Sequence, residues 1–332
     1  MSFKRLDPED ISISAESIVT PLWSTNSKTL TTFFTSSAQT NSTGDYFYRI
    51  YNTDSTSTQI AQLGITYGDK QGSGSAPYNA NVLGKSPSST IYGQYRNLVF
   101  GDEDTNFAFQ AQTSDYIYVI SMDRARYKEK LLPGSFNLTL QGTGGKVLKL
   151  TDNSTTLSTI SYVDSGRVYD IVSGSDGAPV AGTTGLNTLK GSYGKYLPDV
   201  GIIVLNGVAL DNATDGINLG TIRTGANDLN ITKFYNAIKA GANFDSQAEE
   251  TVSSNYIFVR VRNGEFNYST NPSNITGSGE LRHDVMINTP QAYLTTVGLY
   301  NDNNDLLAVA KLSKPLLKDF TKEALVRIKL DY

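Results

Sequence analysis

The chain has 332 residues, a net charge of −4, no cysteine and a single histidine, His283. Without cysteine, the sequence excludes disulfide frameworks, thiolate metal sites and cysteine nucleophiles, and any Ser-His-Asp triad would have to use His283. The mildly acidic charge gives no indication of general nucleic-acid binding, and the length predicts two or three domains or one large β domain.

Short strand-forming runs, separated by turn residues, dominate the first two thirds of the chain. The predicted strands in this part are 46–51, 59–67, 107–110, 116–121, 135–140, 147–151, 159–162, 167–172 and 201–205. Strands at such short intervals are typical of sandwiches and barrels. Only 18% of residues are charged, so the polarity comes mainly from hydroxyl and amide groups, which suits β-sheets with long loops.

Three short helices are predicted between the strands. Ser86-Pro87 is a typical helix start, and that helix can run to Gly101. A second helix is predicted over 123–131, before Pro133-Gly134. The third covers 230–240, where apolar residues recur at i, i+3, i+4 and i+7 before Gly241 ends the pattern.

The C-terminal part predicts further strands. One is 256–262, followed by an Asn-Gly turn and a returning segment over 265–268. Residues 293–300, 306–311 and 324–332 predict an antiparallel meander, with Pro315 in the connection before the last strand. In that last strand Val326, Ile328 and Leu330 fall on one face, as the period of two in a half-buried strand requires.

The fold class predicted from these elements is mainly β: antiparallel sandwich or barrel-like domains with a few short helices and long loops. We expect residues 1–132 and 199–332 to form one β-rich body, with an N-terminal arm and the C-terminal meander, and 133–198 to form a small inserted β domain. The opening MSFKRLDPED lacks an apolar run, so no secretory signal is expected. No stretch of about 18 apolar residues predicts a membrane span.

Three motifs resemble reactive or ligand-binding sequences and are better explained structurally. His283 is followed by Asp284, and adjacent side chains on a strand point apart, so a surface or structural histidine is favoured. The segment 79–86 lacks the first glycine that a phosphate loop requires. The segment 211–216 begins like an EF-hand loop, but Ala213 and Ile222 occupy places that need oxygen ligands, so a turn is predicted.

Two charged clusters leave alternatives open. The acidic segment 102–104 is either an exposed loop or a site for a hard cation. Four basic residues recur at every second position and would share one face if the segment were extended, where they could contact an acidic partner; otherwise they form a solvated surface. These residues are Arg124, Arg126, Lys128 and Lys130.

The 20 tyrosines also allow two interpretations. Exposed aromatic rings can stack on sugars, which would favour a receptor- or glycan-binding protein. Tyrosine is also enriched at protein–protein contacts, where it offers a large area and one hydroxyl. The strand pattern is compatible with both.

The last forty residues read YLTTVGLYNDNNDLLAVAKLSKPLLKDFTKEALVRIKLDY. This run resembles the closing segment of virion structural proteins from contractile-tailed bacteriophages, especially cyanophage-like myoviruses. The opening SFKRLDPEDISISAESIV and the internal phrases YVISMDRARYKEKLLPGSFNLTL and SSNYIFVRVRNGEFNYSTNPS are similar to the same group. The general layout is similar to the baseplate wedge protein that bridges wedge subunits.

The resemblance implies a non-enzymatic structural subunit, present in several copies in the virion tail or baseplate and assembled in the host cytoplasm. Its implied partners are other tail and baseplate proteins, without nucleic acid, and it implies no catalytic residue, metal or cofactor. The alternatives are a receptor- or glycan-binding tail protein and a neck or head-decoration protein. A hydrolase that uses two opposed carboxylates is a third possibility on the residues alone.

Overall fold

The computed structural model describes residues 6–21, 28–35, 47–74, 86–180, 191–224 and 229–332. The chain divides into unit 1, Met1–Val19 with Thr251–Tyr332, and unit 2, Thr20–Glu250. Both contain antiparallel sheets and only short helices, which confirms the predicted fold class. The expected boundaries at 133 and 198 do not separate these units, because strands before, within and after 133–198 join one sheet.

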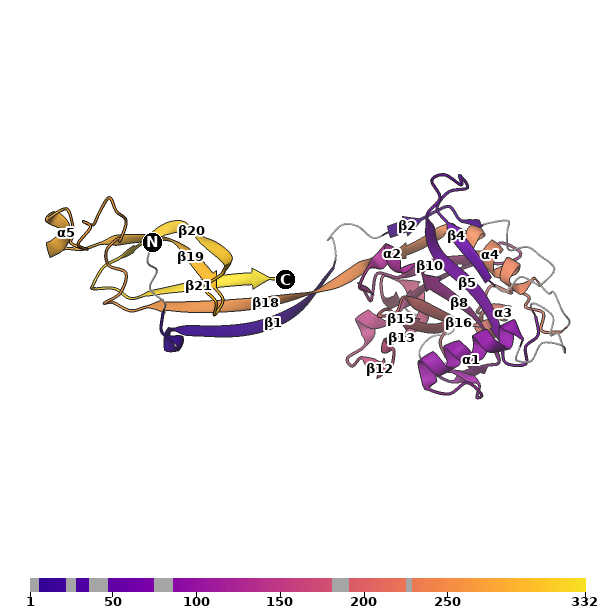
Figure 1. The fold of residues 1–332 in the computed structure, drawn as a ribbon. Helices are drawn as coiled ribbons and strands as arrows, with labels where there is room; N and C mark the ends of the chain where they lie inside the picture. The colour runs from indigo at the N-terminus through magenta and orange to yellow at the C-terminus, as the bar shows by residue number, and fades with distance from the viewer. Residues whose placement is uncertain (1–5, 22–27, 36–46, 75–85, 181–190, 225–228) are drawn as a thin grey trace. The chain divides into compact units, whose positions relative to one another are not determined.

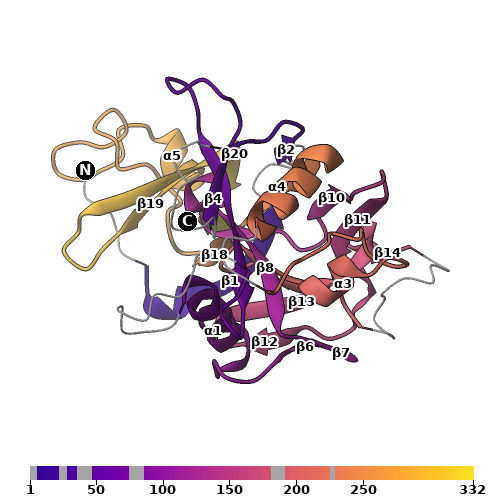
Figure 2. The ribbon, with the colours of Figure 1, turned by 90° about the vertical axis from the view of Figure 1, so that its right-hand side faces the viewer.

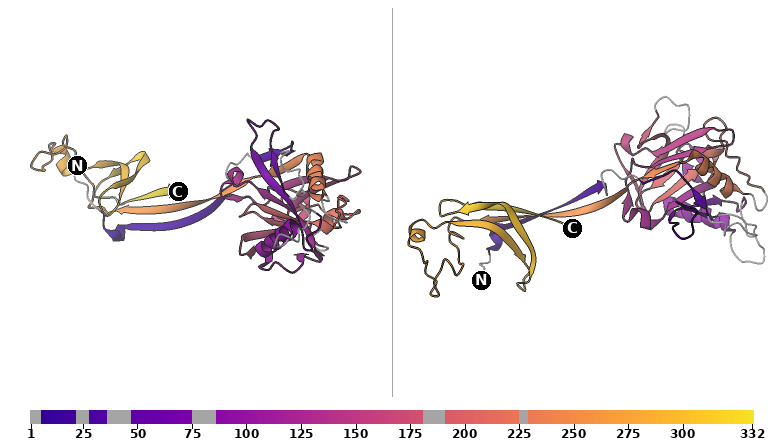
Figure 3. Two further views of the ribbon diagram at one scale, coloured as in Figure 1. Left: turned by 45° about the vertical axis from the view of Figure 1, so that its right-hand side comes forward. Right: turned by 90° about the horizontal axis from the view of Figure 1, so that it is seen from above.

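Unit 2 contains a 13-stranded sheet that curls into a half-barrel (Figure 3). Its main path is β2-β17-β10-β11-β13-β15-β16-β8-β5-β4-β3, and β12 and β14 pair with β13. The strands are β2 (Lys28–Leu30), β3 (Phe34–Thr35), β4 (Phe47–Tyr51), β5 (Ala61–Asp69), β8 (Tyr116–Met122), β10 (Asn137–Gln141), β11 (Val147–Asp152), β12 (Ser161–Val163), β13 (Gly166–Ser175), β14 (Ala178–Pro179), β15 (Gly194–Leu197), β16 (Ile202–Asn206) and β17 (Asn243–Ser246).

The remaining elements of unit 2 are short. The hairpin β6 (Phe107–Phe109) and β7 (Gln112–Ser114) forms a sheet of its own, and β9 (Lys130–Leu131) pairs with the start of β18 (Ala248–Val261). The helices are α1 (Pro87–Phe100), α2 (Arg124–Tyr127), α3 (Gly207–Asp211), α4 (Asn230–Gly241) and the 3₁₀ turn η3 (Ser154–Thr156).

Strand β8 shows why the core of unit 2 has two layers. Successive side chains of a strand point to opposite faces. Tyr118 and Ile120 join the larger apolar cluster, which includes α4, whereas Ile117 and Val119 join a second cluster, which includes α1. The two helices lie on different sides of β8 (Figure 2). A strand buried on both faces therefore has the nearly continuous apolar sequence YIYVISM.

Two of the three predicted helices are confirmed. The Ser86 side chain caps α1 by accepting a hydrogen bond from the Ser89 N–H, and Gly101 ends the helix in the left-handed region with φ 77°. Helix α4 buries the predicted apolar stripe, including Phe234 and Ile238. The helix predicted over 123–131 is only one turn, because Lys128 has φ 61° and the chain then enters β9.

Unit 1 consists of a small sheet and a hairpin packed on one of its faces (Figure 1). The sheet order is β1-β18-β21, and the hairpin is formed by β19 and β20. Ile257 opposes Ile328 and Val259 opposes Val326, so these side chains share the face that packs against the hairpin. The elements are η1 (Pro8–Asp10), β1 (Ile11–Pro21), α5 (Val285–Asn288), β19 (Ala292–Tyr300), β20 (Leu306–Lys318) and β21 (Ala324–Asp331).

The predicted C-terminal meander is correct for its first hairpin and wrong for its last strand. Strand β21 pairs with β18 over eight residues and does not continue the β19–β20 sheet. Alternation specifies an apolar face, but it does not specify the hydrogen-bonded neighbour. Pro315 lies inside β20. The register of the β19–β20 pairing shifts between Leu294 and Thr296, so a proline, which has no N–H to donate to the ladder, is tolerated at this position. The predicted returning strand at 265–268 is a loop.

Candidate interaction surface of unit 1

Unit 1 exposes more large apolar side chains than it buries. In its described part eighteen large apolar side chains are exposed, from Ile11 to Tyr332. Five apolar residues of the same part are buried: Val259, Val261, Ala324, Val326 and Ile328. Unit 2, in contrast, buries most of its large apolar residues in two clusters. Apolar surface of this extent marks an interaction site more often than a free surface.

An apolar groove of about 730 Å³ lies between the sheet and the hairpin of unit 1. Ile11 and Ile13 of β1 line it, together with Val259 of β18 and Leu299 and Leu307 of the hairpin. Ile13 is 64% exposed and Leu307 is 68% exposed. Both side chains therefore offer apolar surface without contributing much to the core of a single copy.

Strand β1 forms one wall of this groove and is also an edge strand. It pairs with β18, and within the described residues no strand is paired to its other side. Ten of its eleven residues are exposed, and Glu16 is its one charged residue. Natural edge strands are usually short or protected by lysine or an internal proline, and here the proline, Pro21, comes only at the end. The edge is therefore available for pairing with another strand.

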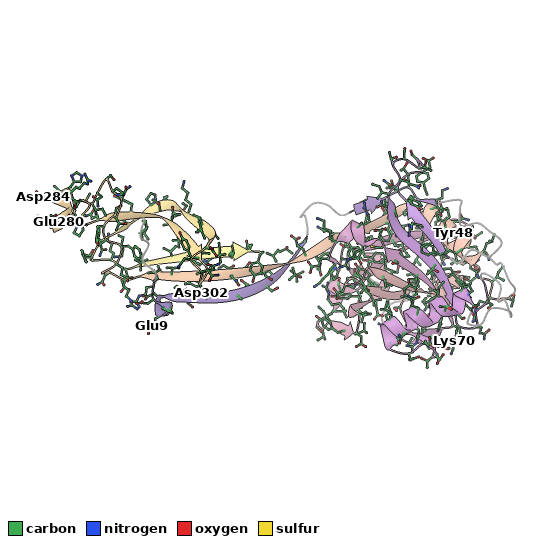
Figure 4. The ribbon with its side chains drawn as sticks, viewed as in Figure 1. Glu9, Tyr48, Lys70, Glu280, Asp284 and Asp302 are labelled. Carbon is green, nitrogen blue, oxygen red and sulfur yellow. The ribbon has the colours of Figure 1, made fainter. Side chains whose placement is uncertain are left out.

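The hairpin and the helix α5 add exposed apolar groups outside the groove. Tyr293 of β19 is 66% exposed and Val309 of β20 is 57% exposed. Val285 of α5 is 79% exposed. The acidic residues Glu280 and Asp284 lie beside α5, as the side-chain view shows (Figure 4).

Two arginines, one in β18 and one directly after it, are paired with carboxylates inside unit 1. Arg262 Nε donates to Oδ1 of the buried Asp10 at 3.1 Å, and the Arg262 guanidinium lies 3.4 Å from Asp7. Arg260 forms an exposed pair with Glu323 at 3.0 Å. The hydrogen bond to Asp10 is the main cause that raises the pKa of Arg262. Arg260 and Arg262 are therefore engaged within unit 1, and the lining of the groove itself is mainly apolar.

A buried lysine fixes the end of β20. The Lys318 ammonium donates to the backbone oxygen of Asn263 at 3.0 Å, to Asn267 Oδ1 at 2.7 Å and to the backbone oxygen of Asp319 at 2.9 Å. Burial lowers the pKa of Lys318. Because all three of its N–H donors are used, we interpret Lys318 as a structural anchor between β20 and the loop after β18.

The basic residues predicted as a partner contact do not form one extended face. Arg124 and Arg126 lie in the single turn α2, and Lys130 begins β9. Arg124 and Lys128 are exposed, whereas Arg126 and Lys130 are half-buried. The Arg124 guanidinium lies 5.1 Å from the Tyr127 ring. A partner contact through these residues stays a prediction.

The other sequence motifs lie in structural settings. His283 is exposed in the segment before α5. Asp102 accepts hydrogen bonds from Thr105 and lies 3.2 Å from Arg96, so one acid of the 102–104 segment already has a cationic neighbour. Helix α3 ends at Asp211, and residues 212–216 form a turn after it, as predicted. Residues 79–85 of the phosphate-loop-like segment lie outside the described residues.

Two buried carboxylates of unit 2, Asp69 and Glu249, are paired with arginines. Asp69 is fully buried and accepts from Arg223 Nε at 2.6 Å. Arg167 contacts Glu249 and lies 2.7 Å from Asp199. Burial opposes ionisation of both arginines, but their carboxylate partners outweigh it and raise the pKa of each. Carboxylates that are held by an arginine in this way indicate structural roles rather than free acids or bases.

Within the described residues no group of three or more histidine, cysteine or acidic side chains is placed to hold a metal ion. Among the described residues, no helix is both long enough and apolar enough to cross a bilayer. Comparisons with protein families, curated proteins and solved structures find no match to this chain.

Proposed function

We propose that the chain is a non-enzymatic structural subunit that assembles with other proteins through unit 1. The observation that carries this proposal is the excess of exposed over buried large apolar side chains in unit 1. Burial of apolar surface is the main driving force of protein association. The groove, the β1 edge and the hairpin together offer the kind of surface that a stable interface covers.

The division into two units supports a bridging role. Each unit has its own apolar cluster, and the chain crosses between them within two strands, β1 and β18. A protein built from two such bodies can bind one neighbour through each. The structural reading is further supported by the arginine-paired carboxylates Asp69 and Glu249 and by the exposed position of His283.

The location we propose is the virion of a contractile-tailed bacteriophage, in the baseplate wedge of the tail. This part of the proposal rests on the sequence resemblance, above all on the last forty residues. These residues include all but the first residue of β19 and the whole of β20 and β21, so the phrase that resembles virion proteins belongs to the unit with the exposed apolar surface.

A density map of the intact particle tests this function. We expect the chain in the baseplate, with the exposed apolar residues of unit 1 buried against neighbouring chains. Location in the neck or on the head would contradict the wedge assignment. Complete and infectious particles that lack the chain, or turnover of a substrate by the purified protein, would contradict the structural role itself.

The chain has 20 tyrosines, but their positions support the glycan-binding alternative less than their number does. Ten of them are buried, and most of these lie in the large cluster of unit 2, such as Tyr118 and Tyr196. In unit 1, Tyr300 lines the groove, but the other lining residues are mainly aliphatic. Binding to a glycan array by the purified chain would revive this alternative.

A further inference from the structure

We propose that the partner that covers the apolar surface of unit 1 is unit 1 of a second copy of this chain. The inference rests on the proposed function, because it names the partner of the same surface. The surface meant here is the groove together with the free edge of β1, which forms one of its walls.

The surface meant here has an apolar area at the upper end of what a monomer ordinarily carries. Seven of the eighteen exposed side chains lie on it, namely Ile11, Ile13, Ile18, Val19, Tyr300, Leu307 and Leu330. At roughly half exposure they present on the order of 600 Å². The largest apolar patch on a typical monomer is about 300–600 Å². A standard protein–protein interface covers about 800 Å² on each partner. Because a little more than half of such an interface is apolar, the groove and the β1 edge together have enough apolar area for one interface with another protein.

The charge of unit 1 is compatible with self-association. It contains eleven basic and twelve acidic residues, so two copies have almost no net repulsion. Several of these charges are already paired within the copy, such as Arg262 with Asp10 and Lys329 with Asp331. A strongly acidic or basic partner would be favoured by a surface of one charge sign, and unit 1 does not have that composition.

The edge of β1 supplies the second argument for an identical partner. Two identical strand edges can pair in the antiparallel sense about a two-fold axis, so that every contact is made twice. Glu16 is the one charged residue of β1, and the sequence Ile11-Ser12-Ile13-Ser14 places apolar and small polar side chains alternately. Strand pairing would satisfy the backbone groups of the edge, and Ile11 and Ile13 would bring the groove into the same interface.

The test measures the mass of the purified full-length chain in solution over a range of concentrations. We expect the wild type to associate into a multiple of the 36.1 kDa chain. Two variants place a charge in the proposed interface, Ile13→Asp and Leu307→Asp. Both positions are largely exposed in one copy, so the variants keep the fold of the monomer. Each variant is expected to weaken association by at least about tenfold.

Matched controls place the same charge on exposed apolar positions of unit 2. Val147 is 52% exposed and Leu157 is 40% exposed. Val147→Asp and Leu157→Asp are expected to associate as the wild type does. Circular dichroism of all four variants checks that the secondary structure is retained.

Three outcomes would overturn the inference. A wild-type chain that is monomeric at all concentrations shows that unit 2 or a different protein covers the surface. Association that survives both Ile13→Asp and Leu307→Asp places the interface elsewhere. Association lost equally in the unit 2 controls shows a nonspecific effect. The proposed function would still stand if the particle map showed unit 1 buried against a different protein, so the two failures are distinguishable.

Discussion

Arg167 is the residue whose environment most clearly shows a structural use of charge. Its Nη2 lies 2.7 Å from Asp199 Oδ1 and also contacts Glu249, whose side chain is 2% exposed. The Arg167 backbone N–H donates to the second oxygen of Asp199 at 2.7 Å. One guanidinium therefore connects β13 to the segment before β16 and to the start of β18.

Replacement of Arg167 is expected to destabilise unit 2 strongly. Arg167→Met leaves Glu249 as a buried charge without this partner, and loss of one member of a buried pair costs about 3–5 kcal/mol. The control is Lys149→Met, because Lys149 of β11 is exposed and lies outside this network. That change is expected to cost less than about 1 kcal/mol. Urea unfolding measures both values, and equal losses would contradict the prediction.

The ion pair between Arg167 and Asp199 predicts how the free energy of unfolding of unit 2 depends on pH. Burial raises the pKa of Asp199, but the hydrogen bonds from Arg167 outweigh it, and the net pKa is lowered. A group with a lowered pKa in the folded state contributes stability above its unfolded pKa of about 3.9, and that contribution is lost as the pH falls through the folded value. We therefore expect the free-energy difference between wild type and Asp199→Asn to be largest near neutral pH and to shrink below about pH 4. A constant difference in unfolding experiments from neutral to acidic pH would contradict this.

At the scale of single elements, helix α1 has its signals within its own sequence. Ser86 caps its start, Pro87 occupies the first turn, and Gly101 provides the left-handed end. These features act over a few residues, so they could be predicted without knowledge of the tertiary fold. Helix α4 was predictable for the same reason, from the spacing of Ile231, Phe234, Tyr235 and Ile238.

The end of α1 allows a direct test of this local encoding. Gly101 has φ 77°, and a Cβ added there would meet no atom within 4 Å. Gly101→Ala therefore tests backbone strain alone and is expected to cost about 1 kcal/mol in the free energy of unfolding. Gly101→Asn is the matched variant and is expected to cost less, because asparagine tolerates the left-handed region better. Thermal unfolding compares the two, and equal losses would show that the conformation of residue 101 is not the cause.

Strand partners and the candidate surface were less predictable, because they depend on contacts between distant residues. The alternation in 324–331 predicted a strand with one apolar face, yet its partner proved to be β18, some seventy residues earlier. The sequence also contained a signal for β1 in the alternation Ile11-Ser12-Ile13-Ser14. That pattern indicates a strand, but whether Ile13 is covered depends on residues of the hairpin such as Leu307.

At the scale of the whole molecule, the two units differ in how much apolar surface stabilises them. In unit 2, buried side chains from many strands form two clusters, and the large one includes Tyr118, Phe136 and Phe234. In unit 1 the central cluster consists of Val259, Val326 and Ile328 with partly buried neighbours. Because buried apolar area provides most of the folding free energy, we expect unit 1 to be the less stable of the two units when no partner covers its apolar surface.

This difference predicts unequal and concentration-dependent hydrogen exchange. At low protein concentration, the amides of β18 and β21 in unit 1 are expected to exchange faster than those of β5, β8 and β16 in unit 2, because local opening costs less free energy where fewer apolar contacts are lost. At high concentration, covering the apolar surface should slow exchange in β1, β18 and β21, whereas unit 2 should change little. Mass spectrometry of peptides from both units measures this, with Leu307→Asp as the control in which the concentration effect is reduced. Equal protection of the two units at every concentration would show that the core of unit 1 is sufficient for its stability.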